Sequence, residues 1–243
     1  MKNTAIIIPS RLGAKRFPNK PLMTINNVPM IIHVFNRAKE SKVGEVIVAT
    51  PDNKILDIVK KNGGRAILTE ENHSSGTDRV HEVYFRELKD KVDLIINLQG
   101  DMPNINPKAI SKLEKLMRES DCKIGTLAAK IEKKEDIENP NIVKVDVCQD
   151  LGKNDFLSAK DFFRTKSSSN SEKIYHHIGI YAFTTDALTK YVNLPRSKME
   201  IYRKLEQMRA IENNLQINVG LSDAKPKGVD TQEDLTNIKK EMK

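Results

Sequence analysis

Four cationic side chains gather in a short stretch near the start of the chain, with no acidic residue among them. The stretch follows an apolar run that ends at Pro9, and it contains Gly13, Pro18 and Pro21, as loops do. Arginine offers paired planar donors and lysine a point charge, so such groups can neutralise nucleotide phosphates and stabilise the departure of pyrophosphate. The pattern GxxxxGK(S/T) of a P-loop is missing, and by chemistry alone a solvated basic loop is equally compatible. The cations are Arg11, Lys15, Arg16 and Lys20.

Two aspartates at distant points of the chain could hold a divalent cation. Asp101 ends the apolar segment IINLQGD, and Asp230 lies in the turn GVDT before the last helical pattern. Mg²⁺ prefers octahedral oxygen ligands, and one or two carboxylates with phosphate oxygens and water suffice. Taken singly, each residue is more often a turn or capping aspartate. Beside Asp101, Gln99 could contact ribose or substrate, and Gly100 allows close backbone approach.

A third polar group stands on the segment HHIGIYAF, which has strand character. The two-residue period of a strand places His177 and Tyr181 on one face, with Gly179 between them. The opposite face carries Ile178 and Ile180. A polar face beside an apolar one suits the wall of a pocket, although an ordinary sheet-face histidine is compatible with the same pattern.

The elements that must position these groups alternate between strand and helix in the first half of the chain. Such alternation predicts a mostly parallel sheet with helices on both faces, whose ligands bind beyond the carboxyl ends of the strands. The loops after residues 9, 50, 68 and 98 are therefore the ones expected to carry function. The expected elements are strands at 4–10, 44–50, 65–68 and 92–101, and helices at 29–41, 53–63 and 77–89.

The second half contains strands without long helices between them, which indicates a small mixed-sheet lobe. We expect a polar stretch at 152–173, in which the serine run 167–171 forms a mobile surface loop. Thr231 is the expected N-cap of a closing helix, with Asp234 at the capping-box position. The other expected elements are a helix at 108–118, strands at 123–131, 142–150, 175–183 and 216–222, and helices at 185–194 and 197–214.

Length and composition limit the classes of protein. At 243 residues, with 38% hydrophobic and 30% charged residues, the chain can form one large α/β domain or one domain with a smaller lobe. The longest apolar runs are strand-sized, far short of the roughly 20 residues of a membrane span, and the start of the chain lacks a signal-peptide pattern. We therefore expect a cytoplasmic protein. Cys122 and Cys148 lie far apart without a metal-binding pattern, so buried free thiols are expected.

The net charge of +8 is concentrated at the start of the chain. Residues 1–50 hold eight lysines and arginines against two glutamates, and the remainder mixes both signs. A compact cluster of this kind suits a small polyanion such as a triphosphate better than a nucleic-acid duplex, which requires a basic stripe or helix. No nucleic-acid partner is expected.

The basic loop RLGAKRFPNKPL resembles the RxxSxRxPxKxL signature of nucleotidyltransferases that activate sugars and sugar acids. Among them it is most similar to the 3-deoxy-manno-octulosonate cytidylyltransferase family. The similarity continues in order through PMIIHVFNRAKES, VIVATPD, HSSGTDRV, NLQGDMP, NPNIVKV, HHIGIYAF, LEQMRAIEN and GVDTQEDL, which covers most of the chain. It implies a single Rossmann-like nucleotidyltransferase α/β fold over 1–243, CTP as the nucleotide, Mg²⁺ as the cofactor, and a homodimer. The nucleotide-binding core would comprise 1–122 and 184–243, and the sugar-binding and dimerisation lobe 123–183.

The resemblance assigns the nucleotide to two loops and Mg²⁺ to Asp101 and Asp230. Catalysis falls to the cations Arg11, Arg16 and Lys20 together with Asp101. The segment HSSGTDR corresponds to the loop that reads the base, where a tight turn can offer backbone groups that distinguish cytosine from uracil. On its own that segment is only a turn. The residues expected to bind nucleotide are Pro9, Ser10, Arg11, Lys20, His73, Ser74, Ser75, Gly76 and Gln99.

For the acceptor sugar, the resemblance implies His177, Tyr181, Glu206 and Gln207, with Gln99 shared between nucleotide and sugar. The implied reaction is attack by the anomeric hydroxyl of a sugar acid on the α-phosphate of CTP, which forms a CMP-sugar precursor of lipopolysaccharide. Catalysis would rest mainly on positioning and charge neutralisation. No general base is evident in the sequence.

The chain departs from the family pattern at two places. Met102 stands where the family has glutamate, and Ala159 stands where it has arginine, followed by Lys160. Because lysine does not reproduce the paired donors of arginine, the identity of the sugar acid and the group that binds its carboxylate stay open. Either the octulosonate is altered, as in an amino-sugar relative, or Lys160 or Arg164 binds its carboxylate.

Other activities stay open as well: a cytidylyltransferase for a sialic-type acid or a polyol phosphate, or a nucleotide-binding relative without turnover. The segments HHIGIYAF and LEQMR favour the octulosonate type. The retained pair Asp101 and Asp230 favours an enzyme.

Overall fold

The computed structural model describes residues 3–13, 17–165 and 173–242. The chain divides into two compact units, one made of residues 1–111 with 226–243 and the other of residues 112–225. The second unit is larger than the predicted lobe 123–183, because strand β11 (Ile217–Leu221) pairs in parallel with β7 (Ile124–Ala129). Arg16 and the serine run 167–171 lie outside the described residues.

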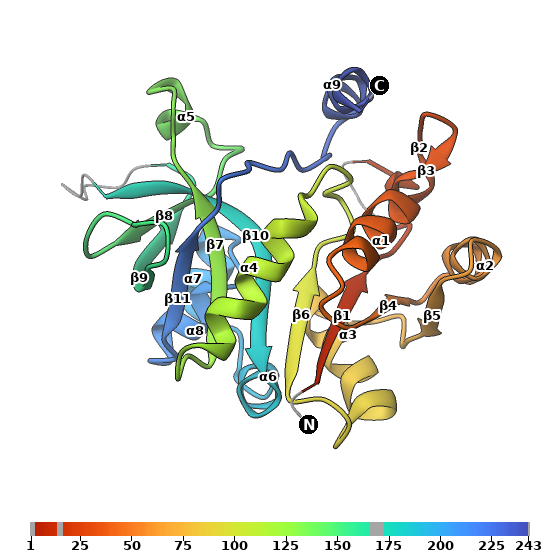
Figure 1. Ribbon diagram of the computed structural model, residues 1–243, viewed down its shortest axis with the longest axis horizontal. Helices are drawn as coiled ribbons and strands as arrows, with labels where there is room; N and C mark the ends of the chain where they lie inside the picture. The colour runs from red at the N-terminus through yellow and green to blue at the C-terminus, as the bar shows by residue number, and fades with distance from the viewer. Residues whose placement is uncertain (1–2, 14–16, 166–172, 243) are drawn as a thin grey trace. The chain divides into compact units, whose positions relative to one another are not determined.

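The first unit contains a parallel sheet in the order β5-β4-β1-β6 (Figure 1). Both β1 and β6 are buried throughout, as expected of strands that are rich in β-branched residues and covered on both faces. All four strands run in the same direction, so the loops after Pro9, Thr50, Leu68 and Leu98 leave from the same edge. This confirms the predicted parallel sheet. The strands are β1 (Thr4–Pro9), β4 (Glu45–Thr50), β5 (Arg65–Leu68) and β6 (Leu94–Leu98).

The helices of this unit lie close to their predicted limits. Helix α3 passes directly into a π-helical turn, η2 (Tyr84–Leu88), within the single helix predicted at 77–89. At the end of the chain, Thr231 and Asp234 form the predicted capping box. Helix α4 begins in this unit and continues into the second. The helices are α1 (Met30–Glu40), α2 (Asn53–Lys61), α3 (Gly76–Val83), α4 (Pro107–Arg118) and α9 (Gln232–Glu241).

A small hydrophobic cluster joins the segment after the basic loop to the C-terminal helix. The short 3-10 helix η1 (Lys20–Leu22) leads into a hairpin of β2 (Thr24–Ile25) and β3 (Val28–Pro29). Asn26 and Asn27 turn this hairpin with positive φ angles, as a two-residue turn requires. The cluster joins the two chain segments of this unit. Its buried members are Ile25, Met30, Val229, Leu235 and Ile238.

The second unit contains a mixed sheet in the order β10-β7-β11-β9-β8, and β8 pairs in turn with β10, so the pairings close into a ring. The expectation of a mixed sheet is confirmed. Within 152–173, for which the sequence indicates only a polar stretch, Phe156–Phe163 forms β9 between β8 and β11. Lys160 and Asp161 interrupt the apolar pattern of that strand. The remaining strands are β8 (Lys144–Val147) and β10 (Ile174–Thr184).

Two further expectations are corrected in this unit. The predicted helix 197–214 is two short helices, α7 (Lys198–Arg203) and α8 (Met208–Glu212), because Lys204 adopts a left-handed conformation that ends α7. Buried thiols were also expected, but Cys148 is exposed, since it follows the last buried residue of β8, and Cys122 is half-buried. The other helices are α5 (Glu135–Glu138) and α6 (Thr185–Val192).

Within the described ranges, every helix is too short or too polar to cross a membrane.

Candidate active site

The start of the basic loop is held by the strand beside it. The Ser10 N–H donates to the Ala49 carbonyl at 2.9 Å, and the Leu12 N–H donates to Asp52 Oδ2 at 2.8 Å. Ser10 is buried, and its hydroxyl has no hydrogen-bond partner among the residues described. Arg11 is exposed. Asp52 therefore anchors the loop, a role that the sequence did not reveal, because an aspartate before a helix normally predicts an N-cap.

The far end of the loop places a lysine between two carboxylates. The Asn19 N–H donates to the Leu12 carbonyl at 3.1 Å, and η1 begins at the next residue. The Lys20 Nζ lies 2.9 Å from Asp101 Oδ2 and 3.1 Å from Asp230 Oδ1. Burial lowers the pKa of Lys20, but the two carboxylates together raise it by more, so the pKa is above its ordinary value. Lys20 is therefore a firmly protonated cation.

Backbone contacts bring together the two aspartates, which lie in the two separate chain segments of the first unit. The Val229 N–H donates to the Asp101 carbonyl at 2.9 Å, which docks the C-terminal segment against the loop after β6. The Asp230 N–H donates to Asp234 Oδ2 at 3.0 Å, so the cap of α9 sets its position. The cluster of Ile25, Met30 and Val229 supports the same junction.

The paired carboxylates fit a hard divalent cation. Their oxygens converge on the Lys20 ammonium, so they already face a common positive charge. The described part of the chain contains no group of three or more His, Cys, Asp or Glu side chains arranged for a metal. Two protein carboxylates with phosphate and water oxygens match the way Mg²⁺ is bound beside nucleotides. Met102 is buried at 5% exposure, so the family's glutamate position is occupied by a core side chain here.

These loops line an open cavity of about 250 Å³ in the first unit. Of the predicted nucleotide-binding residues, Ser74 is exposed and is not part of the lining. A Cβ atom on Gly100 would lie 3.1 Å from the Pro9 carbonyl oxygen, so a glycine lets these two loops approach closely. The lining consists of Pro9, Ser10, Arg11, Lys20, Pro21, His73, Ser75, Gly76, Arg79, Gln99, Gly100 and Asp101.

A relay of amides orients Gln99 at the cavity. Asn97, buried in β6, donates to Thr77 Oγ1 at 3.0 Å, and Gln99 donates to Asn97 Oδ1 at 3.1 Å. With its amide nitrogen used in this way, Gln99 is held with its carbonyl oxygen near the start of α3, where a Cβ on Gly76 would lie 3.7 Å away. Gln99 thus offers the cavity a fixed acceptor.

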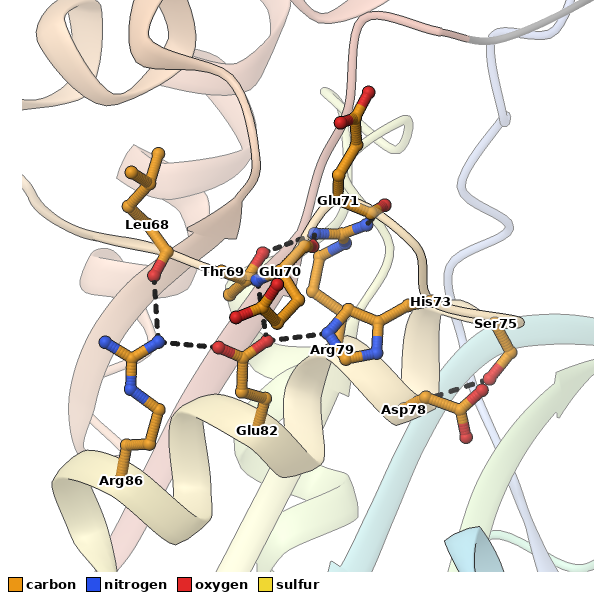
Figure 2. A network of polar contacts seen from close by, with 10 residues as sticks. All are labelled: Leu68, Thr69, Glu70, Glu71, His73, Ser75, Asp78, Arg79, Glu82 and Arg86. Atoms are coloured by element: carbon orange, nitrogen blue, oxygen red, sulfur yellow. Dashed lines mark hydrogen bonds and ion pairs between the residues drawn. The ribbon is translucent and has the colours of Figure 1, made fainter.

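The loop after β5 is held by side chains of α3, as Figure 2 shows. Arg79, only 3% exposed, donates to Thr69 Oγ1, to the Glu70 carbonyl at 2.8 Å and to the Glu71 carbonyl at 3.2 Å. Arg79 was not among the predicted site residues. The arginine of HSSGTDRV was its only signal, because contacts with a loop eight to ten residues earlier leave no pattern in the sequence.

A carboxylate on the next turn of the helix holds the same loop (Figure 2). Glu82 Oε2 accepts from the Glu70 N–H at 3.0 Å and lies 2.6 Å from His73 Nε2, while Oε1 accepts from Arg86 at 2.6 Å. Burial raises the pKa of Glu82, but the bonds from His73 and Arg86 outweigh it and leave the pKa below its ordinary value. The loop ends at Ser75, whose hydroxyl caps α3 by accepting from the Asp78 N–H at 3.2 Å.

In the second unit, His177 is a buried neutral side chain. Its Nε2 lies 3.0 Å from Thr126 Oγ1, and the Thr126 hydroxyl is 2.7 Å from the Ile180 carbonyl. Because the hydroxyl has one hydrogen and gives it to that carbonyl, His177 Nε2 must be the donor. Burial, followed by the charge of His176, lowers the pKa of His177 to about 3. The ring packs edge-on against Phe162, with centroids 5.1 Å apart.

The predicted neighbours of His177 gather around it. A register shift between Ile178 and Tyr181 interrupts the expected strand period, yet the His177 and Tyr181 rings lie 5.3 Å apart. The buried Tyr181 hydroxyl has no hydrogen-bond partner in the described part of the chain. Burial, and then Glu206, raises the pKa of Tyr181 well above its ordinary value. Gln207 is buried next to Glu206 in the chain.

The departures on the sugar side fall on β9 and the segment after it. Ala159 is buried and Lys160 is exposed. Arg164 donates to the carbonyls of Pro140 at 3.2 Å and Asn141 at 3.4 Å, so its guanidinium is already used to hold that loop. That Lys160 or Arg164 binds the sugar carboxylate stays a prediction.

The chain is similar to known proteins along nearly its whole length. A family model described as cytidylyltransferase matches residues 5–217. The 3-deoxy-manno-octulosonate cytidylyltransferase of Rhodopseudomonas palustris (strain BisB18) is 42% identical, with 98% of this chain and 96% of the relative covered. The enzyme of the same name from Thermodesulfovibrio yellowstonii is 44% identical, with 96% and 95% covered.

A solved structure gives the same result. The structure described as CMP:2-keto-3-deoxy-manno-octonic acid synthetase complexed with CTP matches with a TM-score of 0.88 and 37% identity, over 99% of this chain and 98% of that one. Its fold is the α/β nucleotidyltransferase fold predicted above. The chain belongs to the 3-deoxy-manno-octulosonate cytidylyltransferase family.

Proposed function

We propose that this protein transfers CMP from CTP to a 3-deoxy-octulosonate-type sugar acid and releases pyrophosphate, which supplies an activated sugar for lipopolysaccharide. The observation that carries the proposal is the position of Lys20 between Asp101 and Asp230, at a cavity lined by both the basic loop and the HSSG loop. Triphosphate, base and metal thus find matching groups in one place. The names of the relatives and the CTP complex of the matching structure support the same reaction.

At the nucleotide, the protein's contribution is charge and fixed donors. Arg11 and Lys20 face the cavity and can neutralise the charge that develops on departing pyrophosphate. The buried Ser10 hydroxyl supplies a donor that no described residue uses. Arg16, outside the described residues, is proposed to join them. His73, Ser75 and Gly76 are proposed to face the cytosine, and the exposed Ser74 lies between His73 and Ser75.

Cytidylyltransferases of this type use a divalent metal, and we propose Mg²⁺ here. Asp101 and Asp230 would hold it, because their oxygens already converge on one cation. Bound there, the metal would supply charge stabilisation at the phosphates and lower the pKa of a nearby hydroxyl. The residues of the chain hold the phosphates and orient the anomeric hydroxyl of the sugar for attack on the α-phosphate.

At the sugar, two of the proposed groups are neutral. His177 is uncharged at physiological pH, and Tyr181 keeps its proton, so both suit sugar hydroxyls rather than a carboxylate. Glu206 and Gln207 are proposed to complete this surface. Because Ala159 replaces the arginine of the family pattern, the second candidate is an altered octulosonate such as an amino-sugar relative. The predicted homodimer and cytoplasmic location remain predictions, and light scattering of the purified protein tests the first.

Pyrophosphate release tests the proposal directly. The purified protein is incubated with Mg²⁺, either CTP or UTP, and a panel that contains an octulosonate, its amino-sugar relative and a sialic-type acid. We expect release with CTP and one octulosonate. Release with the sialic-type acid alone would replace the assigned substrate, and no release with any acid would overturn the proposed function.

A further inference from the structure

We propose that Arg79 and Glu82 are positioning residues for base selection: they fix the loop 69–75 so that the nucleotide cavity accepts cytosine and rejects uracil. The inference rests on the proposed function, since it names residues that would make that site specific for CTP. Neither side chain belongs to the groups assigned to phosphate, metal or sugar.

The first observation is the set of groups that Arg79 holds. Its buried guanidinium donates to one hydroxyl and to two consecutive backbone carbonyls, those of Glu70 and Glu71. Buried cations are usually paired directly with an acid, because leaving water is costly. Here the hydrogen-bond acceptors described are neutral groups of one loop. A planar group with several fixed donors can hold two successive peptide groups in one orientation, which a lysine cannot do.

The second observation is that Glu82 accepts a hydrogen bond from the same loop, whereas Arg79 donates to it. Its Oε2 accepts from the Glu70 N–H, whereas the carbonyl of that residue goes to Arg79. The same oxygen bonds the His73 ring, and Figure 2 shows the cation and the carboxylate reaching the loop from successive turns of α3. The spacing of three residues places both side chains on one helix face. The backbone N–H and the backbone carbonyl of Glu70 are thus both fixed.

The third observation is where the loop goes next. His73, Ser75 and Gly76 line the cavity, as does Arg79 itself, so the held segment lies within a few residues of the groups facing the ligand. Cytosine presents an amino donor where uracil presents a carbonyl acceptor. A site built to accept a hydrogen bond from the amino group rejects a base that lacks this donor, as long as the acceptor of the site keeps its orientation. By fixing the preceding peptide groups, Arg79 and Glu82 prevent its reorientation.

Two conservative variants test the inference. Arg79→Lys keeps the positive charge but loses the planar set of donors, and Glu82→Gln keeps the shape of the side chain but loses its charge. Arg37→Lys is the matched control, because Arg37 pairs only with the exposed Glu40 on α1 among the contacts described. Affinities for CTP and UTP are measured by calorimetry with Mg²⁺, and kcat and KM are measured with the accepted sugar acid.

We expect the CTP-to-UTP affinity ratio to fall by at least about tenfold in both variants, since a polar site that is no longer fixed loses much of its discrimination. KM for CTP should rise more than kcat falls, and the control should match the wild type. An unchanged ratio in both variants, even with lowered stability, would show that the contacts serve folding only. If Arg79→Lys does not fold, the isosteric Glu82→Gln decides the question. Failure of the wild type to bind CTP would instead overturn the proposed function.

Discussion

The polar groups of the two units differ in kind. The cavity of the first unit uses charged side chains on loops, and Lys20, Asp101 and Asp230 are 14%, 30% and 47% exposed. In the second unit, His177, Tyr181 and Thr126 are neutral side chains on strands, and both His177 and Thr126 are buried. A reaction that moves phosphate charge needs cations and carboxylates that water can reach and that can exchange partners. Selecting among hydroxyls needs donors whose direction is fixed by packing.

The largest effect is expected from removal of a carboxylate in the first unit. Asp101→Asn keeps the shape but removes half of the negative charge that faces Lys20. We expect kcat to fall by at least ~100-fold, the scale seen when one group that stabilises developing charge is lost. Steady-state pyrophosphate release measures the change, with Asp57→Asn on the exposed face of α2 as the control. An Asp101→Asn rate within twofold of wild type would show that the aspartate has another role.

Lys20→Met tests the same site from the side of the cation. The carboxylates of Asp101 and Asp230 would then face each other without the ammonium that they share. We expect kcat/KM for CTP to fall by roughly 100-fold, because a cation at the phosphates is lost. The affinity of the nucleotide-free protein for Mn²⁺, followed by electron paramagnetic resonance, should rise, since the metal no longer competes with lysine. A lower Mn²⁺ affinity in this variant would argue against a common position for the two cations.

The parts of the site that could be predicted are those with local signals. The parallel sheet follows from alternating apolar runs, and Asp101 and Asp230 stand at recognisable points, after a strand and before a capped helix. The hydrogen bonds from Arg79 to the loop after β5 could not be predicted, because the packing of α3 decides which groups Arg79 reaches. The break at Lys204 also has no signal, since a positive φ at lysine is dictated by the surrounding fold.

On the sugar side, two features escaped prediction for similar reasons. Strand β9 is stabilised by pairing with distant β8 and β11, which outweighs the charged residues Lys160 and Asp161 in its sequence. The irregularity of β10 between Ile178 and Tyr181 cannot be read from alternating residues. The gathering of His177 and Tyr181 was nevertheless expected, because the two residues are close in the chain.

Tyr181→Phe tests the neutral group of the second unit with a smaller effect. The change removes a buried hydroxyl that has no partner in the described part of the chain. We expect KM for the sugar acid to rise on the order of tenfold, the value of about one hydrogen bond to the ligand, with CTP affinity unchanged. Stability should be unchanged or slightly higher, because an unsatisfied hydroxyl is costly to bury. Thermal unfolding and sugar kinetics check both, and a loss of CTP affinity would contradict the separation of roles.

The smallest effect concerns the protonation of His177. Burial, and then His176, lowers its pKa in the folded protein to about 3, against 6.5 for an ordinary histidine. Between these values the unfolded chain binds the proton and the folded chain does not, so the free energy of unfolding rises with pH. The stabilisation is complete above pH 6.5 and is lost as the pH falls towards 3. His176, with a pKa of about 4, contributes in the same direction. In His177→Asn, urea unfolding should therefore depend less steeply on pH between 4 and 6.5 than in wild type. An equal slope would mean that His177 is protonated in the folded protein, and the buried group would then carry charge like the cavity of the first unit.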